Sequence, residues 1–404
     1  MILLLACTAG TGGPGGDDSS TPGFTWVAPD DVTNETAPGF HSKDDQETLF
    51  DDDDLPRFEL EISSSNIQQM RQEGKYDEHE WVDAAFIYEG VRYEPVGVRI
   101  KGENSFLPID EKPSLKVDFN KFVDGMEFMG LKEITLNNMS NDYSMMHERV
   151  AYYMFRMADM PAARCGHAQL TLNDEDYGLY AHVENVDRTF ADRWFEDTSD
   201  AIMFEVWDVD FYDGYISSFQ LEFGEDDRTT LQGTADALEG TGYNSLVEAG
   251  KYMDIPQFIR FYALETVIGQ YDSYPFANPG DDAHVLMDPA TGLLNWIPHG
   301  MDETFYYPDH DPRGVNGIVA KRCVNVNSCL QDYYAAVWEM QELAESIDLG
   351  GYARTVQAQI ADLVEADTHK QYTNNQVKSY QDSMISFIDT RADKLPAWVG
   401  PRPE

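Results

Sequence analysis

Two short stretches decide the fold, VGVRIK at residues 96–101 and KPSLKVDFNK at residues 112–121. In both, apolar and charged side chains alternate, which is typical of β-strands that bury one face. The pleat places Arg99 and Lys101 on one face of the first strand, and Lys112 and Lys116 on one face of the second. From residue 99 to residue 121 there are five basic and four acidic residues, an unusual balance in a chain of formal charge −45.

These cations would converge on one sheet surface if the two strands are neighbours. Such a surface can bind an anion, and phosphate is a leading candidate because Arg and Lys recognise it well. Surface ion pairs with nearby Glu and Asp are the alternative, and the residues alone leave both open.

The composition restricts the class of protein. The chain has 404 residues, 28 Lys and Arg against 73 Asp and Glu, and 42% hydrophobic residues. This length allows one large domain or two lobes with a substantial core. A surface this acidic repels nucleic-acid phosphates, so we exclude nucleic acid as a partner. No run approaches about 18 apolar residues, so no membrane-spanning helix is expected.

Residues 1–6 and Cys7 resemble the end of a bacterial lipoprotein signal, in which a small residue precedes an acylated Cys. A complete signal has a basic start and an apolar run of about 7–15 residues, whereas no Lys or Arg precedes Cys7. Either the true start lies upstream or the match is chance. The lipoprotein interpretation makes residues 7–55 a disordered acidic linker. It predicts an extracytoplasmic protein of the cell envelope, held at the membrane by a lipid anchor.

The remaining cysteines predict one disulfide. Cys323 and Cys329 enclose five polar or small residues and could close a small loop in an oxidising compartment. Cys165 is then free, and we expect it to be buried. The CxxC spacing of zinc sites is absent, so these thiols are not expected to bind a metal.

Periodicity predicts a β-rich first half and a helix-rich second half. Together they indicate a two-lobed α+β protein, with lobes at about 56–200 and 201–400. Asp142 is the expected N-cap of the one helix in the first half. Strands are predicted at 58–62, 84–88, 91–93, 96–101, 114–119, 169–184 (a hairpin), 283–287 and 293–298, and helices at 144–157, 255–271, 333–347, 352–366 and 375–395.

Three carboxylates follow or precede elements of the second half. Asp272 ends a helix, Asp282 leads into a strand, and Asp302 follows the next strand, so a hairpin could bring them together. Converging carboxylates beside cations suit metal-assisted phosphoryl transfer. Solvated loop carboxylates are the alternative. No Walker A, His-Arg-Asp or Asp-Phe-Gly motif occurs, and a Gly-x-Gly-x-x-Gly match at 10–15 has no strand before it.

The order of these motifs resembles the CotH kinase family, the spore-coat-protein-H-like proteins. The resemblance extends over about residues 57–395. The matching stretches are 96–102, 112–121, 134–138, 142, 147–149, 178–184, 272 and the strand running to 302–305.

The resemblance implies an atypical protein-kinase-like fold and transfer of phosphate from ATP to protein Ser or Thr, with Mg²⁺ or Mn²⁺. It implies that Lys112 or Lys116 contacts the nucleotide phosphates and that Glu148 pairs with that lysine. Asp272 would be the catalytic acid–base and Asp302 a metal ligand. The nucleotide-binding set is then completed by the strand residues Arg99 and Lys101.

Two departures from the family pattern bear on activity. Many members have Trp-Asp-x-Asp where this chain has His299, Gly300, Met301 and Asp302, so one carboxylate is missing. Asp282 stands where members have Asn, and it could serve as a second metal ligand. The expected protein is therefore a monomeric exported kinase with a protein substrate. The alternative is a catalytically inactive surface protein that uses the same fold in adhesion or assembly.

Overall fold

The computed structural model describes residues 43–403 except 52 and 54. The signal residues 1–6, Cys7 and residues 8–42 of the predicted linker lie outside the described residues. Within the part of the chain that is described, no helix is long and apolar enough to cross a membrane. The fold class is α+β, as the periodicity predicts.

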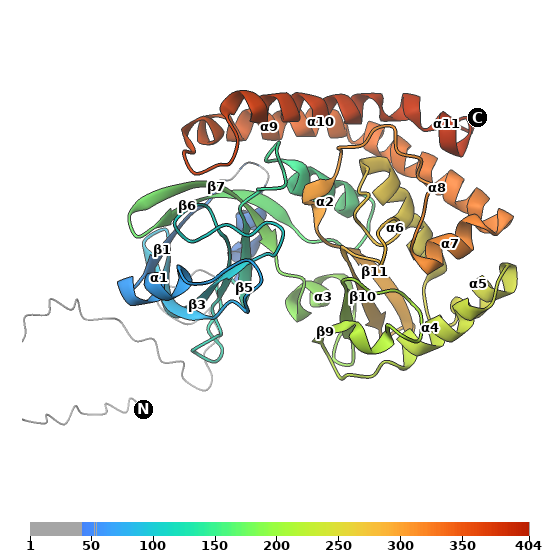
Figure 1. The fold of residues 1–404 in the computed structure, drawn as a ribbon, viewed down its shortest axis with the longest axis horizontal. Helices are drawn as coiled ribbons and strands as arrows, with labels where there is room; N and C mark the ends of the chain where they lie inside the picture. Colours follow the sequence, from blue (N-terminus) through green and yellow to red (C-terminus); the bar gives the residue numbers. More distant parts are fainter. Residues whose placement is uncertain (1–42, 52, 54, 404) are drawn as a thin grey trace, which may run out of the picture.

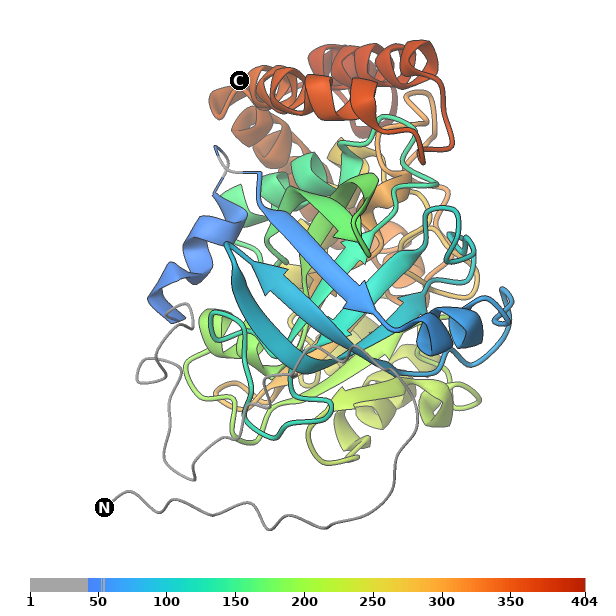
Figure 2. The same ribbon diagram turned by 90° about the vertical axis from the view of Figure 1, so that its left-hand side faces the viewer.

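A closed barrel of seven strands forms the first part of the chain (Figures 1 and 2). Alternate side chains point inward, where Phe58, Phe86, Phe119 and Phe128 contact one another. Neighbouring strands are antiparallel except β1 and β6, whose parallel pairing closes the barrel. The sequence predicts the antiparallel meander but not this closure. In barrel order the strands are β1 (Arg57–Ile62), β2 (Val82–Tyr88), β3 (Val91–Lys101), β4 (Ser114–Asp118), β5 (Glu133–Asn137), β7 (Glu175–Glu184) and β6 (Cys165–Leu172).

The predicted disordered linker of residues 7–55 is wrong near its end, because Lys43–Phe50 form a 3₁₀-helix, η2. Leu49 and Phe50 are buried against the barrel, and the Phe50 ring stacks on His182 with 4.6 Å between centroids. Glu47 pairs with Arg164 of the barrel at 2.6 Å. The two adjacent apolar residues at the end of an acidic segment were the available signal.

A second, four-stranded antiparallel sheet follows, in the order β11-β10-β8-β9. Its β10–β11 hairpin, in which β11 is an edge strand, was predicted, whereas β8 and β9 were not. Trp296 of β11 is fully buried between this sheet and the helices. The strands are β8 (Ile202–Val206), β9 (Gln220–Phe223), β10 (Ala283–Asp288) and β11 (Leu293–Pro298).

Helices cover the second sheet, and α9 and α10 run along one side of the molecule past both the sheet and the barrel (Figure 1). Figure 2 shows the same two helices above the barrel. The predicted helix at 255–271 ends three residues earlier, at Ile268, and the next residue, Gly269, has a left-handed backbone (φ +70°) that glycine tolerates best. The helices are α1 (Ser64–Met70), α2 (His147–Met157), α3 (Arg188–Trp194), α4 (Thr229–Glu239), α5 (Tyr243–Ala249), α6 (Ile255–Ile268), α7 (Ile318–Val324), α8 (Asn327–Ser346), α9 (Leu349–Ala366), α10 (Asn374–Lys394) and α11 (Pro396–Val399), with short 3₁₀ turns η3 (Ile216–Ser218) and η4 (Met301–Glu303).

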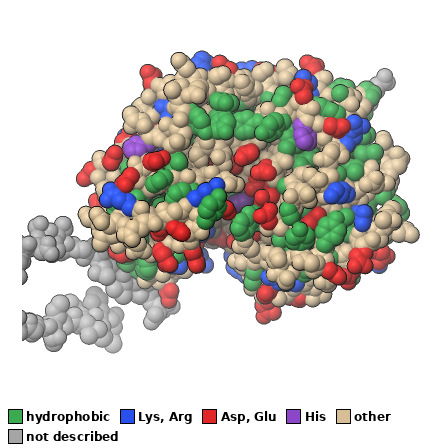
Figure 3. All heavy atoms as spheres, viewed as in Figure 1, with side chains coloured by type: hydrophobic (Ala, Val, Ile, Leu, Met, Phe, Trp, Pro, Cys, Tyr) green, Lys and Arg blue, Asp and Glu red, His purple; other side chains and the backbone are tan. Residues whose placement is uncertain are grey.

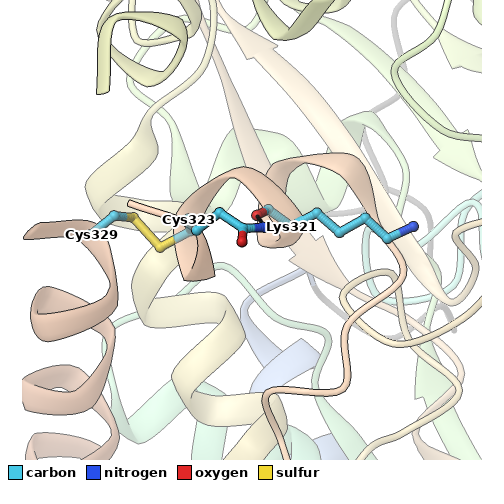
Figure 4. Close-up of a disulfide and its surroundings, with 4 residues drawn as sticks. Lys321, Cys323 and Cys329 are labelled. Carbon is cyan, nitrogen blue, oxygen red and sulfur yellow. Dashed lines mark hydrogen bonds between the residues drawn. A yellow bond between two sulfur atoms is a disulfide. The ribbon is translucent and has the colours of Figure 1, made fainter. Parts of the chain in front are cut away.

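Cys323 and Cys329 form a disulfide that joins α7 to the start of α8 (Figure 4). Both cysteines are buried, and their Cα atoms lie 5.1 Å apart. Cys165 is free and buried, as expected.

Candidate active site

A lysine and a glutamate of the barrel side are connected through one asparagine. Lys101 Nζ at the end of β3 donates to Asn137 Oδ1 at 2.8 Å, and Asn137 Nδ2 donates to Glu148 Oε1 at 2.7 Å. Glu148 lies in the first turn of α2 and is 3% exposed, and its Oε2 has no hydrogen-bond partner among the described residues. The pair therefore has one unused carboxylate oxygen.

Burial dominates the electrostatics of this connection. It lowers the pKa of Lys101, an effect that the nearby Glu148 partly offsets. Burial, and secondarily the charge of Asp302, raises the pKa of Glu148 to about 8. Burial thus opposes the charged form of both groups.

The predicted N-cap Asp142 is wrong, because the N-cap of α2 is Met146, which makes no side-chain capping hydrogen bond. The predicted helix at 144–157 begins at His147, and Asp142 Oδ2 accepts a hydrogen bond from His147 N at 2.6 Å. His147 Nδ1 in turn lies 3.0 Å from the carbonyl oxygen of Asp302. These contacts hold Glu148 of α2 close to η4, the turn that carries Asp302.

Asp302 and Asp282 are neighbouring carboxylates whose pKa values are both raised. Burial raises the pKa of Asp302, and burial followed by the charge of Asp302 raises the pKa of Asp282 well above its usual value. The charge of Lys101, in contrast, lowers the pKa of Asp302. The structure thus brings Asp282 and Asp302 together beside Lys101 and Glu148.

Gly300 makes room for Asp282. Gly300 has a left-handed backbone (φ +56°), and a Cβ on it would lie 2.0 Å from Asp282 Oδ1. Gln270 Nε2 donates to the Gly300 carbonyl at 2.6 Å and approaches Asp282 Oδ2 at 3.4 Å. The family pattern would place a carboxylate at position 300. In this chain the Asp282 carboxylate lies in the space next to Gly300 instead.

Asp272 lies at the surface of the same acidic group, just beyond the end of α6. Partial desolvation, followed by the charge of Asp208, raises its pKa. Burial and the charges of Asp272 and Asp208 raise the pKa of Asp281 to about 6. The charge of Asp272 also raises the pKa of Asp282. The three predicted carboxylates at 272, 282 and 302 are thus neighbours.

The outer face of the barrel supplies the cations. Arg99 and Lys116 are cross-strand neighbours, and Lys116 Nζ pairs with Glu133 at 2.7 Å. The Arg99 guanidinium lies over the Trp81 ring at 5.0 Å, while its buried Nε has no partner among the described residues. The ion-pair alternative is therefore present at Lys116, while Arg99 keeps one buried donor, Nε, without a partner among the described residues.

Facing these cations is the second sheet, with a group of residues that the sequence analysis missed. His284 and Glu205 are cross-strand neighbours, and the rings of His284 and His299 lie 4.7 Å apart. Burial, followed by Lys101 and Lys116, lowers the pKa of His299 to about 4, and burial and neighbouring carboxylates raise the pKa of Glu205 to about 7. Figure 3 shows carboxylates gathered in the hollow between barrel and sheet, beside basic and histidine side chains.

Lys112 does not belong to this site, which corrects its predicted role in phosphate binding. It is 0% exposed and forms a buried ion pair with Asp367 at the end of α9. Its ammonium also lies 5.1 Å from the centre of the Tyr180 ring. The prediction that Lys112 and Lys116 share one strand face is wrong, because β4 begins at Ser114 and Lys112 lies in the loop before it, where it faces Asp367. The lysine connected to Glu148 is Lys101.

The acidic group fits a metal–nucleotide complex better than a free ion. Among the described residues, no cluster of three or more His, Cys, Asp or Glu side chains is arranged to hold a metal. Mg²⁺ in phosphate-transfer sites is held by one or two carboxylates plus substrate phosphates. In such an arrangement, Asp302 and Asp282 would be the two carboxylates.

The family model described as CotH kinase protein matches residues 98–395. The chain belongs to the CotH kinase family and is a kinase-like protein. No curated protein matches the chain significantly.

Two solved structures are similar over most of their length. A crystal structure of the Helicobacter pylori proinflammatory kinase CtkA matches with 10% identity and a TM-score of 0.28, covering 81% of this chain and 93% of that one. A Shewanella oneidensis MR-1 toxin–antitoxin complex of HipA, HipB and operator DNA matches with 9% identity and a TM-score of 0.30, covering 85% and 72%. Similarity at this level supports no argument about substrate or mechanism.

Proposed function

We propose that the chain is a kinase that transfers phosphate from ATP to Ser or Thr of a protein, with Mg²⁺ or Mn²⁺. One observation carries this proposal, the connection from Lys101 through Asn137 to Glu148 beside Asp302 and Asp282. A half-buried lysine whose glutamate partner has a free oxygen, next to two carboxylates of raised pKa, suits a polyphosphate with its metal.

Each residue has a separate role in this proposal. Lys101 and Arg99 donate to phosphate oxygens, and Glu148 orients Lys101 through Asn137. Asp302 and Asp282 hold the metal, which neutralises charge on the phosphates. Asp272, at the surface, accepts the proton of the acceptor hydroxyl. The barrel then acts as the N-terminal lobe and the second sheet with its helices as the C-terminal lobe.

Gly300 favours a second candidate, a catalytically inactive surface protein. Asp282 occupies the space beside Gly300, but a carboxylate on a different backbone position presents its oxygens from another direction. A chain of this kind would retain the hollow between the barrel and the second sheet, here called the cleft, and would bind nucleotide weakly or not at all.

The deciding experiment is a thermal-shift titration with ATP and Mg²⁺ or Mn²⁺, followed by mass spectrometry for autophosphorylation. A ligand that binds only the native state raises the melting temperature by mass action. We expect a metal-dependent shift in the wild type and in Asp272→Asn, its loss in Asp302→Ala, and phosphate transfer in the wild type alone.

Asp236→Asn is the matched control, because Asp236 is exposed on α4, outside the cleft. It should behave as the wild type in both measurements. Intact wild-type protein that binds ATP with metal but transfers phosphate neither to itself nor to a panel of acceptor proteins would establish the inactive candidate.

The location outside the cytoplasm is a further part of the proposal and rests on Cys7. With an upstream start restored, Cys7→Ser should release the protein from the membrane fraction, because a lipid would be its only proposed anchor. Membrane association that persists in Cys7→Ser contradicts the lipoprotein interpretation and leaves the kinase proposal unaffected.

A further inference from the structure

The ring of His182 in β7 is buried among apolar groups. His182 is 0% exposed, and neither ring nitrogen has a hydrogen-bond partner among the described residues. Its ring stacks on that of Phe50 at 4.6 Å and meets that of Phe58 edge-on at 5.2 Å between centroids. Its cross-strand neighbours, Leu136 and Gly166, carry no charge. Such surroundings suit a neutral imidazole and disfavour an imidazolium ion.

The charged groups near His182 also oppose its protonation. Among the described side chains, Arg164 is the charged group that acts on it. The two carboxylates of this region, Glu184 of β7 and Glu47 of η2, are paired with Arg164 at 2.7 Å and 2.6 Å. Burial, followed by the charge of Arg164, lowers the pKa of His182 to about 3, and the Leu49 carbonyl offsets only part of this effect.

The 3₁₀-helix η2 covers this histidine and is itself weakly held. It has eight residues, whereas 3₁₀-helices longer than three or four residues are uncommon because their hydrogen bonds have poor geometry. Leu49 and Phe50 pack in the apolar cluster of the barrel interior, and Gln46 donates to the Met129 carbonyl at 3.0 Å. A short element near the start of the described chain, with few buried side chains, can open locally while the barrel stays folded.

We propose that η2 is a pH-sensitive strap, which leaves the barrel when His182 takes up a proton. While η2 is docked, His182 stays neutral; once η2 has left, water reaches the ring and acid can protonate it. An accessible histidine has a pKa near 6.5. The docked state is therefore favoured above about pH 6.5, and the undocking constant should rise by up to about tenfold for each pH unit below that value.

Release of η2 would change the connection between the barrel and the residues before it. The eight residues of η2 would add about 27 Å of extended chain to that connection. The barrel interior around Phe58 would lose its cover of Leu49 and Phe50. The strap lies outside the proposed phosphate-transfer residues, so the inference does not depend on kinase activity.

Hydrogen–deuterium exchange of the full chain, read by mass spectrometry at pH 5, 6, 7 and 8, tests the proposal. Dividing the rates by those of an unstructured peptide of the same sequence removes the intrinsic pH dependence of exchange. We expect the protection of η2 to fall about 20-fold from pH 7 to pH 5, with no matching fall in α4. Constant protection of η2, or a parallel fall in both elements, overturns the proposal.

Two variants assign the effect to the imidazole. His182→Phe and His182→Leu replace it with apolar side chains, and either one, if folded, should keep η2 protected at pH 5. Glu47→Gln is the control, because it removes the exposed ion pair with Arg164 and leaves His182 in place. It should lower the protection of η2 by a similar factor at each pH and keep the pH dependence. A folded His182 variant that loses protection in acid as the wild type does overturns the proposal.

Discussion

Gly300 and Asp282 occupy one space: a Cβ on Gly300 would lie 2.0 Å from Asp282 Oδ1, and the Gly300 backbone is left-handed. Gln270 holds both by donating to the Gly300 carbonyl and approaching the Asp282 carboxylate. The residue that departs from the family pattern is therefore what allows the neighbouring carboxylate its position. A side chain at position 300 and the carboxylate at position 282 therefore exclude each other in this structure.

A double-mutant cycle measures this coupling. The left-handed backbone alone should make Gly300→Ala lower the free energy of unfolding by about 1–2 kcal/mol. The contact of the new Cβ with Asp282 should lower it further. In an Asp282→Gly background the contact is gone and only the backbone effect remains. Urea denaturation of the four proteins gives the interaction energy. A cycle with additive effects would contradict the shared space.

The two strand lysines should separate nucleotide binding from stability. Lys101→Met removes a donor from the proposed phosphate site and should abolish metal-dependent ATP binding, as measured by calorimetry. Lys112→Met leaves Asp367 buried without its partner and should lower the free energy of unfolding by about 3–5 kcal/mol. ATP affinity of the folded Lys112→Met protein should not change. The reverse assignment of effects would restore Lys112 to the site.

This pair of lysines also shows how far the sequence could predict the structure. Alternation of side chains identifies the strands around Lys101 and Lys116 and gives the face that each lysine occupies. It carries no information on Asp367, which lies far along the chain and reaches Lys112 only when α9 packs on the barrel. By charge alone, Lys101, Lys112 and Lys116 were equivalent candidates for binding phosphate. The contact with Asp367 distinguishes Lys112 from the other two.

The carboxylates show the same limit. A helix end and two strand ends were enough to expect Asp272, Asp282 and Asp302 close together. The facing group of Glu205, His284 and His299 was missed because β8, which carries Glu205, has no alternation, being buried along most of its length. The pairing of β8 with β10 brings Glu205 beside His284.

The Cys323–Cys329 disulfide should contribute modestly to stability. It closes a short loop with a sequence separation of 6, for which loop-closure entropy gives about 2 kcal/mol. A reducing agent should lower the urea midpoint of the wild type and leave Cys323→Ser/Cys329→Ser unaffected. In Cys165→Ala the urea midpoint should still fall when the reducing agent is added, because Cys165 is free. Equal midpoints with and without reductant would show that the bond adds nothing.

Glu148 should make the protein less stable as the pH rises. Burial raises its pKa from 4.5 to about 8 in the folded state, so between these values the folded chain holds a proton that the unfolded chain has released. Stability is then highest below about pH 4.5 for this group and falls as the pH approaches 8, with a slope of at most about 1.4 kcal/mol per pH unit.

Glu148→Gln removes this dependence. Its free energy of unfolding relative to the wild type should increase steadily from pH 4.5 to pH 8, measured by urea denaturation at half-unit steps. Glu239→Gln, an exposed glutamate at the end of α4, controls for the loss of one charge and should show a constant difference. Because burial also lowers the pKa of Lys101, the same series in a Lys101→Met background separates the two groups. Parallel curves for Glu148→Gln and the wild type would mean that Glu148 is already ionised in the folded protein, stabilised by Lys101 through Asn137.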